Sequence, residues 1–430
     1  DLKADAAPTI TNAAEFDIWW NTDETTTPDL KIHRGNVGDM FRLLYLSADA
    51  IRGSYQIDGV ATNSGCAILA EHTRYHLSGT VVKLDEAGTF ATPEVQFSLT
   101  NDTSYRYDPC HSAGSQWRID PAANPSCWSV WFSTFNAVNS SGTPCLNAWS
   151  PAELLQLSRP DLAFEPGTTG GIVSSIIDMH TLTSSANVAA IHHVSRDITV
   201  GGTTSPSVDL LAGDLLLTVA WWTNLMSTNS IIVESDDVFI FRPDTAGDYS
   251  SGTFIMLLDN LAGSSIAITG ISLVEQDTVV GGQTLQAGTF LYSRSWNAHK
   301  NKIYHFTADD VGASTTSGTS TVLVDGSDIS MGGTSGGAAA VAGLDFIEHG
   351  MSIGGTTLQS GQVLVTLDED DNSVGNGTPI VTTKNDIFIL DVTATGKNTT
   401  HATAMLFLDG SDINLDPWIG VDAFSLAPMH

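Results

Sequence analysis

The sequence predicts an all-β fold, and three observations lead to this prediction. Short runs rich in Val, Ile, Phe and Thr recur along the 430 residues, and long helical patterns of Leu, Glu, Lys and Ala are missing. Gly, Ser and Thr are abundant and Lys is scarce, which is typical of strands joined by turns. The third observation is an internal repeat of four strand-like runs, which indicates a repeat architecture.

The repeat is clearest in the C-terminal part of the chain. Its strand-like runs lie at 362–367, 386–390 and 404–408, with an Asp-Gly-Ser-Asp corner at 409–412 and a last run at 419–424. The same order begins upstream at Thr289 and at Asp214, and a weaker copy begins at Trp128. A unit of four short strands cannot bury both of its faces alone, so neighbouring units are expected to stack.

Stacked four-stranded units are typical of a β-propeller, and we expect six blades because one sixth of the chain is close to the spacing of the repeats. Residues 1–12 are expected to form an N-terminal arm, and residues 13–430 a single propeller domain. The expected blades are 13–50, 54–102, 115–180, 188–260, 268–328 and 341–412.

The two ends of the chain support a closed ring. The run at 419–424 is one strand too many for the last blade, while the run that begins at Phe16 lacks a preceding strand. We therefore expect the C-terminal strand to complete the first blade, which would remove an open sheet edge. A row of tandem β-sandwich modules is the alternative fold.

The charge of the chain restricts its partners. Acidic residues outnumber basic ones 48 to 17, giving a formal net charge of −31. Such a surface repels the phosphates of nucleic acid and anionic lipid, and it suits a salty or calcium-rich exterior. No apolar run approaches the length of a membrane-spanning helix. The chain opens at Asp1 without Met or an apolar leader, so we expect a targeting peptide to have been removed and the protein to be extracellular or on the cell surface.

The four cysteines are Cys66, Cys110, Cys127 and Cys145, all in the first third of the chain. An even number in an exported protein predicts two disulfides. Three connectivities are open, of which we prefer Cys110–Cys127 with Cys66–Cys145. A zinc site is the alternative, although no C-x-x-C spacing is present.

Two kinds of acidic segment are candidate calcium sites, and calcium is the only cofactor expected. The first is a loop with Asp368, Asp370, Asp371 and Asn372. The second is the repeated corner, with Asp325 and Asp328 in one copy and Asp409 and Asp412 in the next. Carboxylate and amide oxygens are the ligands that Ca²⁺ requires. The same residues are ordinary turn formers, so a purely structural role is the other interpretation.

Candidate residues for a central site lie on the expected inner strands. His192 and His193 are adjacent, so only one of them can face the channel, and the pair is a candidate metal ligand. We align them with Ser272–Leu273, Asp345–Phe346 and Asp422–Ala423, so Asp345 and Asp422 could contribute to a central polar site.

The tryptophans of the chain also need an interpretation. They include the pairs Trp19–Trp20 and Trp221–Trp222 and the residues Trp128 and Trp131. All fall in strand-like runs, so we expect at least one member of each pair to pack between blades, with stacking on sugar rings as the alternative.

The C-terminal units resemble a repeat of large secreted and cell-surface bacterial proteins. In that repeat, an Asp-Ile-hydrophobic strand precedes a hydrophobic strand that ends in Phe-x-Asp-Gly-Ser, as in 386–389 and 406–412 here. The similarity covers about the second half of the chain. It implies an exported surface protein and brings no catalytic residues with it.

No motif of a hydrolase is found: the chain has no Gly-x-Ser-x-Gly elbow, no His-Glu-x-x-His sequence and no Asp box. We therefore expect a non-catalytic structural protein, a subunit of an extracellular filament, sheath or surface layer. It would self-associate through its N-terminal arm or its blade edges. The alternative is a secreted propeller enzyme or glycan-binding module with polysaccharide as its partner and a site in the central channel.

Overall fold

The computed structural model divides into two compact units, Asp1–Arg118 and Ile119–His430, which are described separately. It describes residues 3–4, 13–21, 56–57, 60–61, 73–82, 95–106, 128–139, 146, 148–182, 187–202, 206–245, 247–262, 266–295, 299–312, 316–334 and 338–428. All four cysteines lie outside these residues, and so does most of the expected N-terminal arm.

The first unit contains a four-stranded antiparallel sheet in the order β1-β2-β5-β6 and a hairpin of β3 and β4. The strands are β1 (Lys3–Ala4), β2 (Ala13–Asn21), β3 (Gln56–Ile57), β4 (Val60–Ala61), β5 (Thr73–Val82) and β6 (Val95–Arg106). The two blades expected at 13–50 and 54–102 thus correspond to strands of one sheet in this unit.

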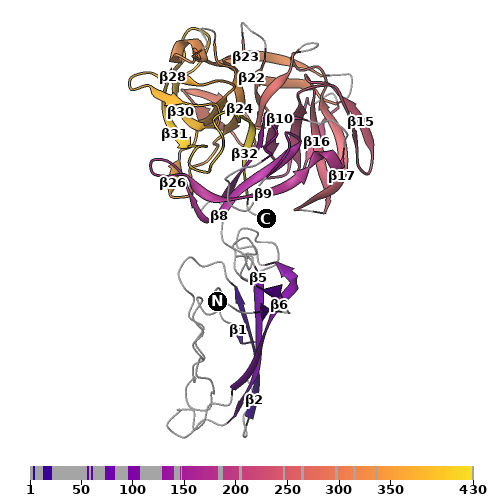
Figure 1. The fold of residues 1–430 in the computed structure, drawn as a ribbon. Coiled ribbons are helices and arrows are strands. Elements are labelled where there is room, and N and C mark those ends of the chain that lie inside the picture. Colours follow the sequence, from indigo (N-terminus) through magenta and orange to yellow (C-terminus); the bar gives the residue numbers. More distant parts are fainter. Residues whose placement is uncertain are drawn as a thin grey trace. The chain divides into compact units, whose positions relative to one another are not determined.

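The second unit is a β-propeller of four blades, not six, and each blade is an antiparallel four-stranded sheet (Figure 1). Blade 1 has the order β32 (Val421–Pro428), β7 (Trp128–Thr134), β8 (Glu153–Ala163) and β9 (Gly170–Asp178). Blade 2 has β10 (Val188–His193), β13 (Leu215–Val219), β16 (Val238–Thr245) and β17 (Asp248–Leu258). Blade 3 has β18 (Ile268–Leu273), β21 (Phe290–Arg294), β22 (Lys302–Asp310) and β23 (Ser317–Asp325). Blade 4 has β24 (Val341–Phe346), β27 (Val363–Leu367), β30 (Ile387–Ala394) and β31 (His401–Leu408).

Short hairpins join the strands of blades 2, 3 and 4. Three lie between the first and second strands: β11 (Ile198–Val200) with β12 (Val208–Leu210), β19 (Thr278–Val280) with β20 (Gln283–Leu285), and β25 (Met351–Ile353) with β26 (Thr356–Leu358). Two lie between the second and third strands: β14 (Thr223–Met226) with β15 (Ser230–Val233), and β28 (Asp371–Val374) with β29 (Ile380–Thr382). The described helical segments are the 3₁₀ turns η3 (Met179–Thr181) and η4 (Gly326–Ile329).

The C-terminal strand does not pair with the strand at Phe16, as the sequence led us to expect. β32 pairs with β7, with Phe424 opposite Phe132, whereas β2 pairs with β1 and β5. The difference follows from the number of blades. The segment from Trp128 to Asp178 provides only three strands of blade 1. The fourth strand of that blade is β32.

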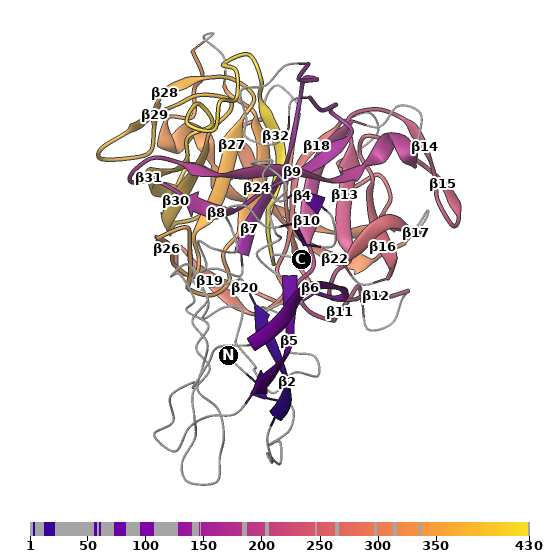
Figure 2. The ribbon, with the colours of Figure 1, turned by 60° about the horizontal axis from the view of Figure 1, so that its bottom comes forward.

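The inner strands β10, β18, β24 and β32 lie toward the middle of the unit, while β15 and β31 lie at its rim (Figures 1 and 2). Each inner strand has a register shift at the same place, after Val188, Ile268, Val341 and Val421. A small residue follows each shift, and at Gly343 a side-chain β-carbon would lie only 2.9 Å from the ring of Phe424. Small residues therefore let neighbouring inner strands approach closely at the axis.

A repeated hydrogen bond ties each blade to the next. A hydroxyl on the second strand of one blade donates to the carbonyl at the register shift of the following blade. The four bonds are Ser133 to Val188 (3.1 Å), Thr218 to Ile268 (3.1 Å), Ser293 to Val341 (3.2 Å) and Thr366 to Val421 (3.3 Å). All four hydroxyl-bearing residues are fully buried. The four bonds therefore connect each blade to its neighbour at the place where the register shifts.

Candidate functional site

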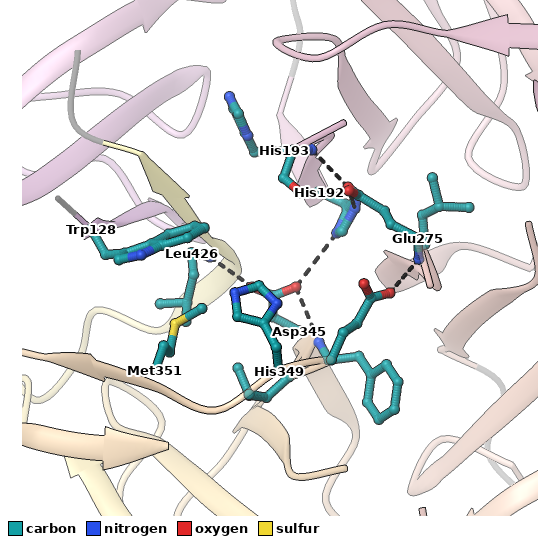
Figure 3. Close-up of a pocket in the computed structure, with 13 residues that line it drawn as sticks. Trp128, His192, His193, Glu275, Asp345, His349, Met351 and Leu426 are labelled. Atoms are coloured by element: carbon teal, nitrogen blue, oxygen red, sulfur yellow. Dashed lines mark hydrogen bonds and ion pairs between the residues drawn. The ribbon is translucent and has the colours of Figure 1, made fainter. Parts of the chain in front are cut away.

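A pocket of about 50 Å³ lies where the inner strands end, and its polar lining includes His192, Glu275 and Asp345 (Figure 3). Glu348 also lines it. The register of the blades explains why these residues meet. His192, Ser272, Asp345 and Ser425 occupy the same position of the four inner strands, opposite Leu216, Leu291, Leu364 and Trp131. The fourfold repeat thus brings one imidazole, one carboxylate and two hydroxyls together at the axis.

Asp345 of blade 4 contacts all three other blades. Its Oδ1 accepts the Ser272 hydroxyl of blade 3 at 3.2 Å and lies 3.5 Å from Nδ1 of His192 in blade 2. Its Oδ2 accepts the Leu426 N–H of blade 1 at 2.7 Å and the Ser425 hydroxyl at 3.4 Å. One buried carboxylate therefore links the four inner strands.

His192 lies between two carboxylates. Nε2 is 3.3 Å from Oε1 of Glu275, and Nδ1 faces Asp345 (Figure 3). Burial alone would lower the pKa of His192, but hydrogen bonds and charge from Asp345 and Glu275 outweigh it and raise this pKa to about 9. The ring is therefore an imidazolium at neutral pH, and both of its nitrogens donate.

Glu275 is a second connection between blades. Burial would raise its pKa, but bonds from His192 and Ser195 prevail and lower it. The Ser195 N–H donates to its Oε1 at 2.7 Å and the Ser195 hydroxyl to its Oε2 at 2.5 Å. Arg196 Nε lies 3.7 Å from Oε2. This carboxylate of blade 3 is thus saturated by donors of blade 2.

Glu348 completes the polar lining of the pocket. Its Oε1 accepts the backbone N–H of Glu275, and its own backbone carbonyl accepts from Gln276 and Ser360. Burial raises the pKa of Glu348 to about 7, and the neighbouring Glu275 carboxylate acts in the same direction. The site therefore gains negative charge as the pH rises through neutrality.

Sequence reasoning missed Glu275, Glu348 and Ser425, although a signal for the glutamates was present. Each glutamate follows the axial residue of its own strand at the same spacing, as Ser195 follows His192. Aligning the repeats on the axial residues would have found Ser195, Glu275 and Glu348 as one set.

Asp422 is not the equivalent of His192, as we expected from the sequence, because the register of β32 places Ser425 there. Asp422 lies at the register shift, three residues earlier, and is buried. Ser133 Oγ lies 2.6 Å from its Oδ1 and 3.1 Å from the Val188 carbonyl. A hydroxyl has one hydrogen, so both contacts are satisfied when Asp422 itself carries a proton. Burial raises its pKa to about 7, in agreement with that geometry.

His193 points away from this cluster (Figure 3). Its ring packs edge-on against Trp131, with the ring centroids 5.4 Å apart. The alternation of a strand explains why the two histidines face opposite ways. The pair does not form a shared metal site.

The carboxylates of the acidic loop accept hydrogen bonds from backbone N–H groups. Asp368 accepts the Ala340 N–H at 2.6 Å, and Asp370 accepts the Lys384 N–H at 3.1 Å. Asp371 accepts the N–H groups of Gly333 and Ser373 at 2.9 and 3.0 Å. Asn372 is exposed. The Ser373 bond is that of a turn residue, and the other three connect the loop to segments distant in the sequence.

The aspartates of the repeated corners stabilise their own turns and also bind the neighbouring blade. Asp325 accepts the Ser327 N–H at 3.2 Å and pairs with Lys302, and Asp409 accepts the Ser411 N–H at 2.9 Å. Asp328 accepts the Thr400 N–H of blade 4 at 3.0 Å, and Asp412 accepts the Thr169 N–H of blade 1 at 2.9 Å. Among the described residues, no three or more His, Cys, Asp or Glu side chains come together as metal ligands.

The tryptophans divide into two groups. Trp128 and Trp131 are buried, as expected for packing between blades. The expectation for Trp221–Trp222 is wrong, because both are exposed and lie in the bend after β13 and not inside a strand. The side chains of Trp19 and Trp20 lie outside the described part of the chain.

Comparison with protein-family models, with curated proteins and with solved structures finds no match to this chain. Within the described residues, no helix is long and apolar enough to cross a membrane.

Proposed function

We propose that the protein is a non-catalytic structural subunit of an extracellular filament, sheath or surface layer, with the propeller as its rigid body. The observation that carries this proposal is the use of the axial polar groups. Asp345 binds donors of the three other blades, and Glu275 binds donors of blade 2. Groups directed at one another in this way stabilise a scaffold and leave little for a substrate.

The size of the pocket supports the same proposal. A pocket of about 50 Å³ has room for one or two water molecules, whereas small-molecule sites have volumes of about 300–1,000 Å³. A space of this size favours a structural role over a small-molecule site.

The sequence supports the proposed location. The net charge of −31 suits an ion-rich exterior, where cations screen repulsion between copies. The resemblance of the Asp-Gly-Ser units to those of secreted and cell-surface bacterial proteins favours export. Calcium is the cation we propose, as a counter-ion between the acidic surfaces of neighbouring copies.

A serine hydrolase is the second candidate function, because Ser272, His192 and Glu275 form a row. Ser272 Oγ lies 3.3 Å from Nδ1 of His192, whose Nε2 faces Glu275 at 3.3 Å. Three features weaken this reading. Ser272 is fully buried, its hydroxyl donates to Asp345, and an imidazolium cannot accept the proton of a nucleophile.

Electron microscopy and sedimentation velocity of the purified intact chain test the structural function. We expect filaments, sheets or concentration-dependent large species, more abundant with Ca²⁺ than with a chelator. A chain that stays monomeric at high concentration with Ca²⁺ would contradict the proposal. Labelling by a fluorophosphonate probe that is abolished by Ser272→Ala would instead favour the hydrolase.

A further inference from the structure

The hairpin β14–β15 in blade 2 has one face in the core and one face in solvent. Leu225 and Val233 are fully buried and belong to the core cluster of that part of the propeller. Met226 and Ile232 point outward and are 55 % and 58 % exposed. The alternation of the two strands produces this division, since successive side chains face opposite ways.

Two exposed tryptophans stand next to this hairpin in the sequence. Trp221 and Trp222 directly precede β14 and are 56 % and 60 % exposed. Trp221, Trp222, Met226 and Ile232 are called the rim patch below, because β14 and β15 lie at the rim of the propeller (Figure 2). Four large apolar side chains in one short segment are more than isolated surface residues.

The rim patch is held on a fixed support. The Met226 N–H donates to the Leu182 carbonyl at 2.7 Å. In the turn of the hairpin, the Asn229 side chain donates to the Phe254 carbonyl at 2.7 Å and accepts the Phe254 N–H at 2.8 Å. The exposed side chains are therefore presented by a braced hairpin, which lowers the entropy lost when a partner binds.

The segment that carries the patch has no charged side chain. Residues 220–233 contain no Asp, Glu, Lys, Arg or His, although the chain as a whole has a formal net charge of −31. Two copies that meet through this segment therefore bring none of its side-chain charges together, despite the net repulsion between two acidic chains. Absence of charge and exposed aromatic residues are the features of an interface centre.

The area agrees with a weak contact between two copies. Four side chains of this size, each more than half exposed, present on the order of 400–500 Å². A symmetric pair would bury roughly 800–1,000 Å², at the lower limit for a specific interface. The corresponding hairpin of blade 4, β28–β29, has Val381 (64 % exposed) as its one large exposed apolar residue, so a cluster of four such residues is particular to the blade 2 hairpin among these two.

The polar groups on the same face argue against a sugar. Asn224 and Ser230 are its exposed polar residues on the two strands, and the Ser230 hydroxyl donates to Asn224 Oδ1 at 2.9 Å. A glycan site needs such groups for the hydroxyls of its ligand, and Met226 and Ile232 lack a flat face for a pyranose ring.

We infer that the rim patch is a self-association surface whose occupant is the rim patch of a second copy of this chain. The inference rests on the proposed structural function and names one contact of the assembly. The same patch on both copies makes a twofold contact, so an extended assembly needs at least one further interface.

The test compares the wild-type chain with Trp222→Ser and with Ile232→Ser in sedimentation velocity over a range of concentrations. Trp418→Ser is the matched control, because Trp418 is 76 % exposed and lies before β32, away from the hairpin. We expect the pairing of copies to weaken at least tenfold in both rim-patch variants and to stay within twofold of wild type in the control. Unchanged circular dichroism and melting temperature show that each variant is folded.

A cross-linking experiment identifies the occupant. A photoreactive residue at position 222 is placed in ¹⁴N chain mixed with ¹⁵N chain, and cross-linked peptides are analysed by mass spectrometry. Cross-links from position 222 to 220–233 of the other isotope are expected. Cross-links to residues 1–118 of the same copy, or to added polysaccharide alone, would overturn the inference. Wild-type assembly that persists unchanged in both variants would overturn it too and leave the structural function standing, whereas a monomeric wild type would overturn both.

Discussion

Two aspartates on the inner strands of neighbouring blades have opposite surroundings. Asp345 on β24 accepts from Ser272, Ser425 and the Leu426 N–H and lies beside an imidazolium. Asp422 on β32 has one side-chain partner, the Ser133 hydroxyl, which also contacts a backbone carbonyl. Both carboxyl groups are buried.

The difference shows what a buried acid needs in this propeller. Donors from several blades converge on Asp345. Asp422 has a single shared hydroxyl as its side-chain partner within the described residues, and burial raises its pKa to about 7. The first aspartate therefore links the blades through several donors, and the second is best accommodated without a charge.

The largest effect is expected for Asp345→Asn. The amide cannot accept at both oxygen positions, and it leaves His192 with only Glu275 as its counter-ion. Removing one partner of a buried ion pair destabilises a protein by about 3–5 kcal/mol. Urea unfolding of the intact chain, with hydrogen exchange of the β24 and β32 peptides, measures the loss. Asp391→Asn, on the exposed side of β30, should change little. Equal losses of stability in Asp345→Asn and Asp391→Asn would contradict the role of Asp345 as a link between the blades.

The second expected effect is a loss of stability as the pH rises and His192 loses its proton. Its pKa is raised from 6.5 to about 9, so its stabilising contribution is complete below pH 6.5 and is lost as the pH rises through 9. The loss between these limits is about 3 kcal/mol, at about 1.4 kcal/mol per pKa unit.

The urea midpoint of the wild type, measured from pH 6.5 to 9.5, should fall accordingly. His192→Gln should be less stable at pH 6.5 and should lack the fall between pH 8 and 9, where Asp422 and Glu348, with pKa values of about 7, no longer titrate. The charged groups that face His192 are Asp345 and Glu275, with Glu348 and Arg196 beside them. A wild-type midpoint that is constant over this range contradicts an imidazolium held by two carboxylates.

Asp422→Asn is expected to stabilise the protein. The folded pKa of Asp422 lies above the ordinary value of 3.8, so its contribution is complete below pH 3.8 and is lost as the pH rises through about 7. Asparagine retains a donor for Ser133 and does not ionise. At pH 8 the variant should be more stable than wild type by about 2–4 kcal/mol, where the upper limit is the full pKa shift at about 1.4 kcal/mol per unit, with no gain at pH 3.5. A gain of the same size at both pH values would indicate a cause other than ionisation.

The sequence was sufficient for the all-β class and for a propeller, because strand period and repeat order are local properties. The prediction of six blades was wrong because we assumed that every strand-like run before residue 125 belongs to the ring. Composition cannot distinguish the sheet of the first unit from two blades, since both are short β-rich runs. The pairing of β32 with β7 joins residues almost 300 positions apart, and no local pattern records it.

The candidate site shows a similar limit. Asp345 and His192 were found because they stand at equivalent places in clear repeats. Asp422 was misplaced by three residues, because the register shift in each inner strand is invisible in a pattern of apolar residues. The exposed Trp221 and Trp222 were taken for strand residues, because an apolar bend and an apolar strand have the same composition.

The smallest loss of stability is expected when a hydroxyl that bonds one blade to the next is removed. Thr218→Val keeps the shape of the side chain and removes the buried hydroxyl that donates to the Ile268 carbonyl. This should destabilise the chain by about 1 kcal/mol at all pH values. Ser133→Ala removes an equivalent donor, but it also takes away the one side-chain partner of Asp422, so its effect should be larger at pH 8 than at pH 4. If the two substitutions have the same pH profile, Ser133 and Asp422 are not coupled, and the contrast between the two aspartates rests on burial alone.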